Sequence, residues 1–253
     1  MRQPSPTGFV ILLFGLLLAS LSACKPSPPA ATAAPDAPDA QLTVPSTSDF
    51  AVTGDGANPA WERAAWTPLT IRRDSGHGYA TRVKMLYSET GLYVLFDGAD
   101  SLLTATLEGD YLELWTEDVY EFFFWTDERY PVYFEYEISP LGYQLPLIIP
   151  NFEDRYFGWI PWQYEGDRVT RKAVSIQGGP ATPGAAISGW RAEVFVPYAL
   201  LTPLQQVPAE KGMRWRANFY RVDYDGGTSS TWSWVPVGES FHTFERYGTL
   251  VFE

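Results

Sequence analysis

The feature that most constrains the fold is a stretch of seven residues in which apolar and polar side chains alternate. In Val132-Tyr-Phe-Glu-Tyr-Glu-Ile138, every second residue from Val132 is apolar, and Glu135 and Glu137 fall on the other face. A period of two is that of a β-strand with one face in the core. The same alternation recurs in Trp190–Val196 and in Met213–Arg221. The chain is therefore predicted to build sheets.

The strand Met213–Arg221 has two faces of different chemistry. Its alternation points four apolar side chains inward: Met213, Trp215, Ala217 and Phe219. The opposite face then carries Arg214, Arg216, Asn218 and Tyr220. Guanidinium and amide groups on one face suit the recognition of hydroxyl groups, and a solvated face is the alternative.

Further strands and turns complete an all-β pattern. Val119–Trp125 is apolar on both faces, as a central strand would be, and Arg82–Tyr87 with Leu92–Asp97 flank a loop that ends in a glycine. The 21 Gly and 21 Pro supply turns, and only Tyr198–Gln206 suggests a helical turn. We predict one domain over residues 49–253, an antiparallel β-sandwich of the jelly-roll type with at most one short helix.

The N-terminus has the pattern of a secretory signal. Arg2 precedes an apolar run of 13 residues from Phe9 to Leu21, which is short of the roughly 20 that span a membrane. The sequence Leu21-Ser-Ala-Cys24 that follows resembles the bacterial lipobox. We expect residues 1–23 to be a lipoprotein signal peptide and Cys24 to carry the lipid anchor, which places the protein in the bacterial cell envelope, at the outer membrane.

A tether is expected between the lipid and the domain. Residues 24–48 are rich in Pro and Ala, and the first aromatic side chain after Cys24 is Phe50. Such a segment has little apolar area to bury and favours extended conformations.

Composition excludes several classes of protein. The formal net charge of −12 argues against nucleic-acid binding, and a single Cys excludes Cys-rich zinc sites. Calcium is compatible with the acidity, and Asp55, Asp97 and Asp100 are candidate oxygen ligands. No spacing here matches a defined calcium loop, so we assign no metal site and no other cofactor.

Six motifs in order resemble one family. They lie in the following segments: Asp55–Trp61, Val83–Asp100, Trp115–Phe123, Gly189–Pro197, Trp215–Arg221 and Phe241–Phe252. Together they resemble the signature of family 9 carbohydrate-binding modules. The chain departs from that pattern at Ser88, where the family has Asp, at Tyr120, where it has Val, and at Glu135, where it has a sugar-binding Arg.

The resemblance implies a sugar-binding site. Family members hold sugars between two aromatic side chains, and Trp115 and Phe241 match those two positions, whereas Glu121 matches an acidic residue that contacts hydroxyls. With Glu135, Arg216 and Asn218 they form the predicted binding set. The implied partner is a mono- or oligosaccharide, and the implied role is carbohydrate catabolism beside a polysaccharide-degrading enzyme, with no catalysis by this chain.

Other interpretations remain open at this point. Glu121 could instead form a structural ion pair with Arg216 or Arg221. A glycoside hydrolase could use a pair among Glu121, Glu135 and Glu137. A haem-binding sandwich would need Met85 or Met213 opposite a His. A purely structural envelope lipoprotein has no sequence feature against it.

Overall fold

A computed structural model describes residues 40–253, apart from 75, 154, 163 and 164. The predicted signal peptide, Cys24 and most of the predicted tether lie outside the described residues. Among the residues that are described, no helix is both long and apolar enough to cross a membrane.

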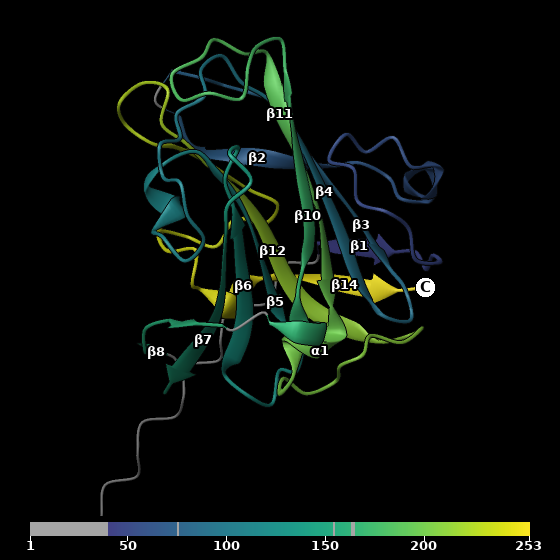
Figure 1. The fold of residues 1–253 in the computed structure, drawn as a ribbon. Coiled ribbons are helices and arrows are strands. Elements are labelled where there is room, and N and C mark those ends of the chain that lie inside the picture. The colour runs from purple at the N-terminus through teal and green to yellow at the C-terminus, as the bar shows by residue number, and fades with distance from the viewer. Residues whose placement is uncertain (1–39, 75, 154, 163–164) are drawn as a thin grey trace, which may run out of the picture. The chain divides into compact units, whose positions relative to one another are not determined.

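The strands form two layers (Figure 1), joined where β2 pairs with β13. The first layer has the order β10 (Arg171–Gln177), β11 (Gly189–Pro197), β4 (Gly91–Ala99), β3 (Thr81–Tyr87) and β2 (Thr67–Arg73). The second has the order β13 (Ser230–Ser233), β12 (Arg214–Asp223), β5 (Val119–Trp125), β6 (Val132–Ile138) and β7 (Gln144–Phe152).

Short elements border these layers. The remaining strands are β1 (Gln41–Val44), β8 (Arg155–Tyr156), β9 (Ile160–Pro161) and β14 (Gly248–Phe252). The helical turns are η1 (Pro59–Arg63), η2 (Leu114–Thr116), η3 (Gly166–Arg168), α1 (Tyr198–Leu201) and η4 (Phe244–Arg246). Over the described residues, the predicted all-β sandwich with one short α-helix is confirmed.

Alternation along the strands builds the core between the layers. Phe122 of β5, Tyr136 of β6 and Phe219 of β12 stand in one cross-strand row and face Phe96 and Val194 of the first layer. All five side chains are buried, as the period of two predicts.

The outer face of the second layer is also covered, because a second apolar cluster packs on it. Phe123 of β5 and Tyr133 of β6 belong to that cluster together with Phe244 and Tyr247, which lie just before β14. The outward side chains of β5, β6 and β12 are therefore largely buried, although sequence alternation alone would place them in solvent.

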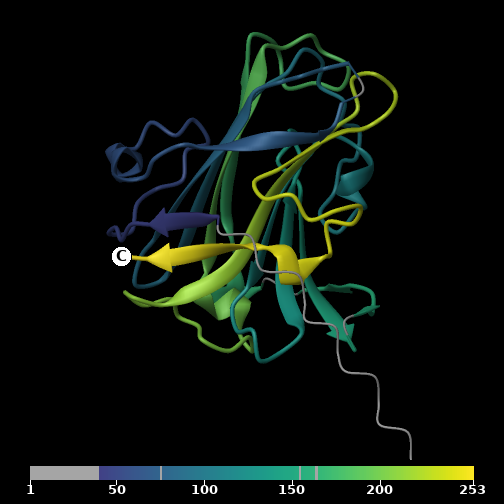
Figure 2. The same cartoon turned by 180° about the vertical axis from the view of Figure 1, so that it is seen from behind.

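The folded part begins earlier than expected. Gln41–Val44, which the sequence analysis placed in the tether, forms β1 and pairs in parallel with β14. Figure 2 shows the two strands side by side. The pairing joins segments some 200 residues apart, so the local sequence carries no sign of the partner strand, and the folded domain includes Gln41–Val44 although it was expected to start at residue 49.

Candidate functional site

A cavity of about 420 Å³ opens on the outer face of the second layer. We call it the glutamate cavity because four glutamates line it: Glu121, Glu135, Glu137 and Glu239. Its aromatic lining comes from Trp115, Phe123, Tyr156, Trp159, Tyr224 and Phe241. The turn with η2, strand β8 and the loop before β14 all lie on this side of the sheet (Figure 1).

Strand register brings three of the glutamates together. Glu121 on β5 lies directly opposite Glu137 on β6, and Glu135 is two residues from Glu137 on the same face. All three are at most 5% exposed. Carboxylates of like charge on neighbouring strands destabilise a sheet, so this arrangement would be an energetic cost to the fold if all three groups were ionised.

Burial changes the protonation of these groups. Removal from water raises the pKa of Glu121 to about 8, although the nearby charge of Arg72 opposes the shift. Burial also raises the pKa values of Glu135 and Glu137 well above their ordinary range, and the charge of Glu121 adds to both shifts. At neutral pH the free cavity therefore holds its buried carboxyls mainly in the protonated form.

Two carboxyl oxygens have no internal partner. Glu135 Oε2 and Glu137 Oε2 are buried and make no hydrogen bond within the described part of the chain. Buried polar atoms are almost always hydrogen-bonded in native proteins, since leaving one unpaired costs about 1–3 kcal/mol. These two atoms line a cavity and are thus available to a ligand.

Aromatic side chains form the rim and walls. Trp115 on η2 is half-buried, and its ring lies edge-on to Trp159 at 5.8 Å between centroids. The Tyr224 hydroxyl donates to the Trp115 carbonyl at 3.1 Å, which fixes that turn. Phe241 stacks on Tyr220 at 4.1 Å, so one face of its ring is already covered.

One guanidinium group borders the cavity. Arg72, from β2, lies 4.7 Å from the centroid of the Phe241 ring and donates to the carbonyl of Gly238. The sequence analysis missed this residue, because β2 is far from the cavity strands in the chain and comes near them only through its pairing with β13.

His242 contributes an uncharged imidazole. Its Nδ1 lies 2.7 Å from the Tyr133 hydroxyl, and its ring lies 4.4 Å from that of Tyr156. Burial lowers the pKa of His242 to about 4. The ring is therefore neutral at physiological pH and does not offset the glutamates.

The structure brings four of the six predicted binding residues together. Trp115, Glu121, Glu135 and Phe241 all line the glutamate cavity. Their contact with a ligand stays a prediction. Tyr156 and Trp159, which the sequence analysis did not single out, line it as well, because the segment after β7 turns back over the sheet.

Arg216 does not reach the cavity. It shares the outer face of the second layer, as predicted, but its Nε donates to the carbonyl of Tyr247 at 3.0 Å, and Nη2 donates to that of Glu245 at 3.3 Å. The segment before β14 covers this end of β12. Its carbonyl groups accept the hydrogen bonds from the Arg216 guanidinium that were predicted to go to a sugar.

Asn218 is likewise used by the fold. Its amide exchanges two hydrogen bonds with the backbone of Val235, at 2.9 and 3.0 Å, and also donates to the Tyr220 hydroxyl. The side chain is fully buried. Neither the predicted sugar contact nor the alternative of a solvated face holds for this residue.

One alternative from the sequence is wrong. Glu121 forms no ion pair with Arg216 or Arg221, because Arg216 lies nearest Glu128 and Arg221 binds aspartates. The haem alternative gains no support from His242, since Met85 lies in the core between the layers and Met213 packs against that core, whereas His242 is outside it.

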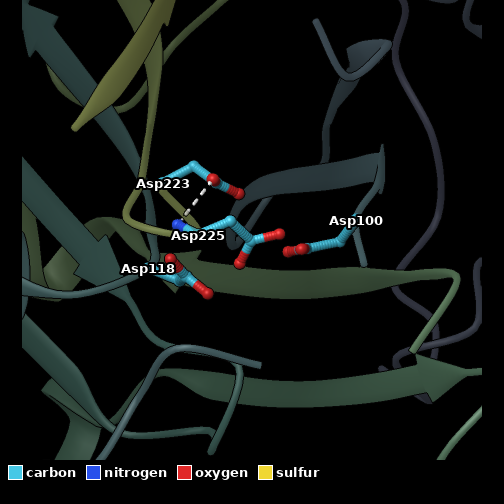
Figure 3. A group of neighbouring side chains, drawn as sticks. All are labelled: Asp100, Asp118, Asp223 and Asp225. Atoms are coloured by element: carbon cyan, nitrogen blue, oxygen red, sulfur yellow. Dashed lines mark hydrogen bonds between the residues drawn. The ribbon is translucent and has the colours of Figure 1, made fainter. Parts of the chain in front are cut away.

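Four aspartates gather at one end of the sandwich (Figure 3). Carboxylate oxygens of Asp100, Asp118, Asp223 and Asp225 lie within 4.8 Å of one another. Such oxygens suit a hard cation. However, the fully buried Arg221 already sits among them, 3.0 Å from Asp100 and 2.5 Å from Asp223.

The remaining acceptors of this aspartate cluster are also occupied. Asp118 accepts from the backbone amides of Thr104 and Tyr224 at 2.7 and 2.9 Å, and Asp225 accepts from the Tyr79 hydroxyl at 2.6 Å. Burial, followed by the charges of Asp223 and Asp100, raises the pKa of Asp118 to about 9. The cluster is thus satisfied by one guanidinium, by a retained proton and by hydrogen bonds.

The three aspartates expected as calcium ligands do not converge. Asp100 belongs to the aspartate cluster. Asp97 instead pairs with Arg82 and Arg191, both at 2.7 Å. Asp55 accepts from the Thr53 hydroxyl in an exposed loop.

A larger hollow lies elsewhere but lacks this chemistry. It measures about 610 Å³ and is lined by Ser46, Arg63, Tyr87 and Glu89 among others. Within the described part of the chain, Tyr87 is its one aromatic side chain. The glutamate cavity is therefore the better candidate site.

Comparison with known proteins supports the fold. No family model matches the chain, and no curated protein matches it. Among solved structures, a protein of Bacteroides uniformis described as carbohydrate-binding is similar with a TM-score of 0.69 at 18% identity, over 84% of this chain and 99% of that one.

A family 9 carbohydrate-binding module of Caldicellulosiruptor kristjanssonii is similar as well. Solved with cellotriose, it gives a TM-score of 0.58 at 13% identity, over 85% of this chain and 94% of that one. Solved with glucose, it gives a TM-score of 0.56 at 14% identity, over 85% of this chain and 96% of that one. This chain therefore has a fold like that of family 9 carbohydrate-binding modules.

Proposed function

We propose that this protein binds a mono- or oligosaccharide in the glutamate cavity. The observation that carries the proposal is that one cavity presents both half-buried aromatic rings and buried carboxyl oxygens without partners. Sugars offer C–H patches that stack on rings, and hydroxyls that hydrogen-bond to carboxyl groups. The structural neighbours, which include a module solved with glucose and with cellotriose, support the same function.

Replacement of Trp115 by alanine should weaken sugar binding tenfold or more. An aromatic contact contributes on the order of 1 kcal/mol beyond the apolar area that it buries, and 1.4 kcal/mol corresponds to a factor of ten. Titration calorimetry of the purified protein against a panel of mono- and oligosaccharides measures the change.

Trp66→Ala is the matched control for that variant, because Trp66 is also a partly buried tryptophan but packs on the outer face of the other layer. It should leave the affinity unchanged. If a ligand from the panel binds Trp115→Ala as tightly as it binds the parent, the site lies elsewhere.

Glycoside hydrolysis is the second candidate, because the structure does gather Glu121, Glu135 and Glu137 in one cavity. A hydrolase needs one protonated and one ionised carboxyl, so the two groups must have environments that give them different pKa values. Here burial raises the pKa values of all three residues together. Binding without turnover is therefore the function that we propose, as an accessory to an enzyme that degrades polysaccharides.

We further propose that a lipid on Cys24 anchors the protein in the outer membrane. Cys24→Ala should move the protein from the membrane fraction to the soluble fraction, because several acyl chains together give stable anchoring at about 0.8 kcal/mol per buried methylene. Fractionation and immunoblotting of cells measure this. A variant that stays in the membrane fraction with unchanged mobility would contradict the proposal.

A further inference from the structure

The glutamate cavity has an excess of acidic groups. Four glutamates line it, and no arginine or lysine nitrogen lies within 4.0 Å of Glu121, Glu135 or Glu137 in the described part of the chain. The nearest guanidinium with a charge effect on Glu121 is that of Arg72, which is already bound to Gly238 and the Phe241 ring. A neutral ligand would leave the three buried carboxyls in their protonated form, whereas a cationic ligand would supply the countercharge that lets them ionise.

The unpaired carboxyl oxygens of the cavity favour a ligand with several strong hydrogen-bond donors. Glu135 Oε2 and Glu137 Oε2 are without partners although their residues are 95% and 99% removed from solvent. A protonated amine brings three N–H donors and one positive charge, so it can satisfy carboxylates on neighbouring strands together. Hydrogen bonds to charged groups are also the stronger ones, at about 1.5–3 kcal/mol.

A metal ion is a poorer occupant. Among the described residues, the carboxylates close enough together to share one ion are those of the aspartate cluster, not the cavity glutamates. The rings around the cavity, with Trp115, Trp159 and Tyr156 among them, suit an organic cation with an apolar face, because ring faces attract ammonium groups and stack on C–H surfaces.

We propose that the glutamate cavity selects an amino sugar, a sugar ring that carries a protonated primary amine, over the corresponding neutral sugar. This inference rests on the proposed sugar-binding function and names its substrate class. The ring of the ligand would lie against the aromatic side chains, and its ammonium group would lie between the carboxyls of Glu135, Glu137 and Glu121.

The affinity should then depend on pH in a defined direction. An ammonium group favours ionised carboxylates, so binding must displace protons from glutamates whose pKa values burial has raised. Affinity for the amine should rise from pH 5.5 to pH 7. A neutral sugar that accepts hydrogen bonds from protonated carboxyls would show the opposite trend.

Other groups around the cavity do not reverse that direction. Burial lowers the pKa of His242 to about 4 and raises the pKa values of Tyr133, Tyr156, Tyr220 and Tyr224 above 10, so all five are neutral in this range. Arg72 stays charged throughout. Glu239 at the exposed rim adds a further acidic group.

The test is calorimetric titration of the full-length protein with D-glucosamine, D-glucose and N-acetyl-D-glucosamine at pH 5.5 and 7. We expect glucosamine to bind at least tenfold more tightly than the other two at pH 7, and more tightly at pH 7 than at pH 5.5. N-acetylglucosamine keeps the nitrogen but lacks its charge, so it separates charge from shape.

Variants of the cavity glutamates test whether these residues cause the preference for the amino sugar. Glu137→Gln should lower the ratio of glucosamine to glucose affinity tenfold or more, and Glu135→Gln is the second variant should the first not fold. Glu108→Gln, an exposed glutamate outside the cavity lining, removes one surface charge as the control and should leave the ratio unchanged.

The outcomes separate this inference from the proposed function. Equal affinity for glucose and glucosamine, or binding of a neutral sugar alone, overturns the amine preference but leaves sugar binding intact. Affinity for glucosamine that falls between pH 5.5 and pH 7 also overturns it. Absence of binding to these three sugars and to the oligosaccharide panel overturns both proposals.

Discussion

Arg221→Met should lower the free energy of unfolding by about 3–5 kcal/mol. The Arg221 side chain is fully buried and binds Asp100 and Asp223 directly, so its removal leaves two buried carboxylates without their countercharge. Its Nη1 also donates to the Thr81 hydroxyl and to the Ala99 carbonyl, at 3.0 and 2.6 Å. Equilibrium denaturation in urea measures the loss.

Arg82→Met is the matched control for that measurement. Arg82 also pairs with an aspartate of the same sandwich, but its side chain is 46% exposed, and Asp97 keeps Arg191 as a partner. Exposed ion pairs contribute about 1 kcal/mol or less. In addition, Arg221→Met/Asp223→Asn should recover part of the stability, because it removes one of the two uncompensated carboxylates.

Equal unfolding midpoints for Arg221→Met and the parent would contradict this account of the aspartate cluster. They would mean that the carboxyls are neutral without Arg221, with each one holding a proton. Burial raises the pKa of Asp118 to about 9, so we expect one member of the cluster to be neutral already in the parent at pH 7.

The strands were the most predictable part of this fold. The predicted ranges Val119–Trp125 and Val132–Ile138 are those of β5 and β6 in the structure. Their alternating apolar side chains pack between the layers, so a local pattern and the tertiary structure agree. By contrast, β1 was missed although Gln41–Val44 alternates polar and apolar residues, because four residues are too short a run to indicate a strand and their parallel partner lies far away in the chain.

The candidate site was predictable only in part. Trp115 and Glu121 were recognised from a motif, and both line the cavity. Arg216 and Asn218 were placed on the correct face of their strand, but the backbone of the segment from Val235 to Tyr247 occupies their polar groups. Tertiary packing decides which loop covers a strand face. The periodicity of the strand therefore does not predict that loop.

The charge of the cavity also escaped the sequence analysis. Alternation identified Glu135 and Glu137 as outward residues, and outward glutamates are usually solvated. Here the turn with η2 and the segment after β7 cover this face of the strands. The glutamates on that face are therefore buried rather than exposed. The chemistry of the site thus arises from the loops that cover the sheet as much as from the strands.

The buried carboxyls should make the protein less stable as the pH rises from 6.5 to 8. Burial raises the pKa of Glu121 to about 8, against an ordinary value of 4.5 in the unfolded chain. Between these two values the folded state binds a proton that the unfolded state lacks, so stability is lost as the pH rises. Each such group contributes about 1.4 kcal/mol per pH unit, or roughly 2 kcal/mol over this range.

His242 contributes little to the pH dependence of stability above pH 6.5. Burial lowers the pKa of His242 from 6.5 to about 4, so the unfolded state binds the extra proton between those values and stability there rises with pH. Above pH 6.5 the imidazole is neutral in the folded state and less than half protonated in the unfolded state, so its contribution falls toward zero as the pH rises. The loss of stability from 6.5 to 8 therefore comes from carboxyls with raised pKa values, including Glu121 and, at about 9, Asp118.

Glu121→Gln should reduce that slope by about 1.4 kcal/mol per pH unit, since glutamine keeps the shape but does not titrate. It also removes a charge that raises the pKa values of Glu135 and Glu137, which acts in the same direction. Urea denaturation at pH 6.5, 7.2 and 8 gives the slopes, with exposed Glu108→Gln as the control. Parallel slopes for Glu121→Gln and the parent would show that Glu121 is ionised in the folded protein, and that its environment in the cavity supplies a positive charge.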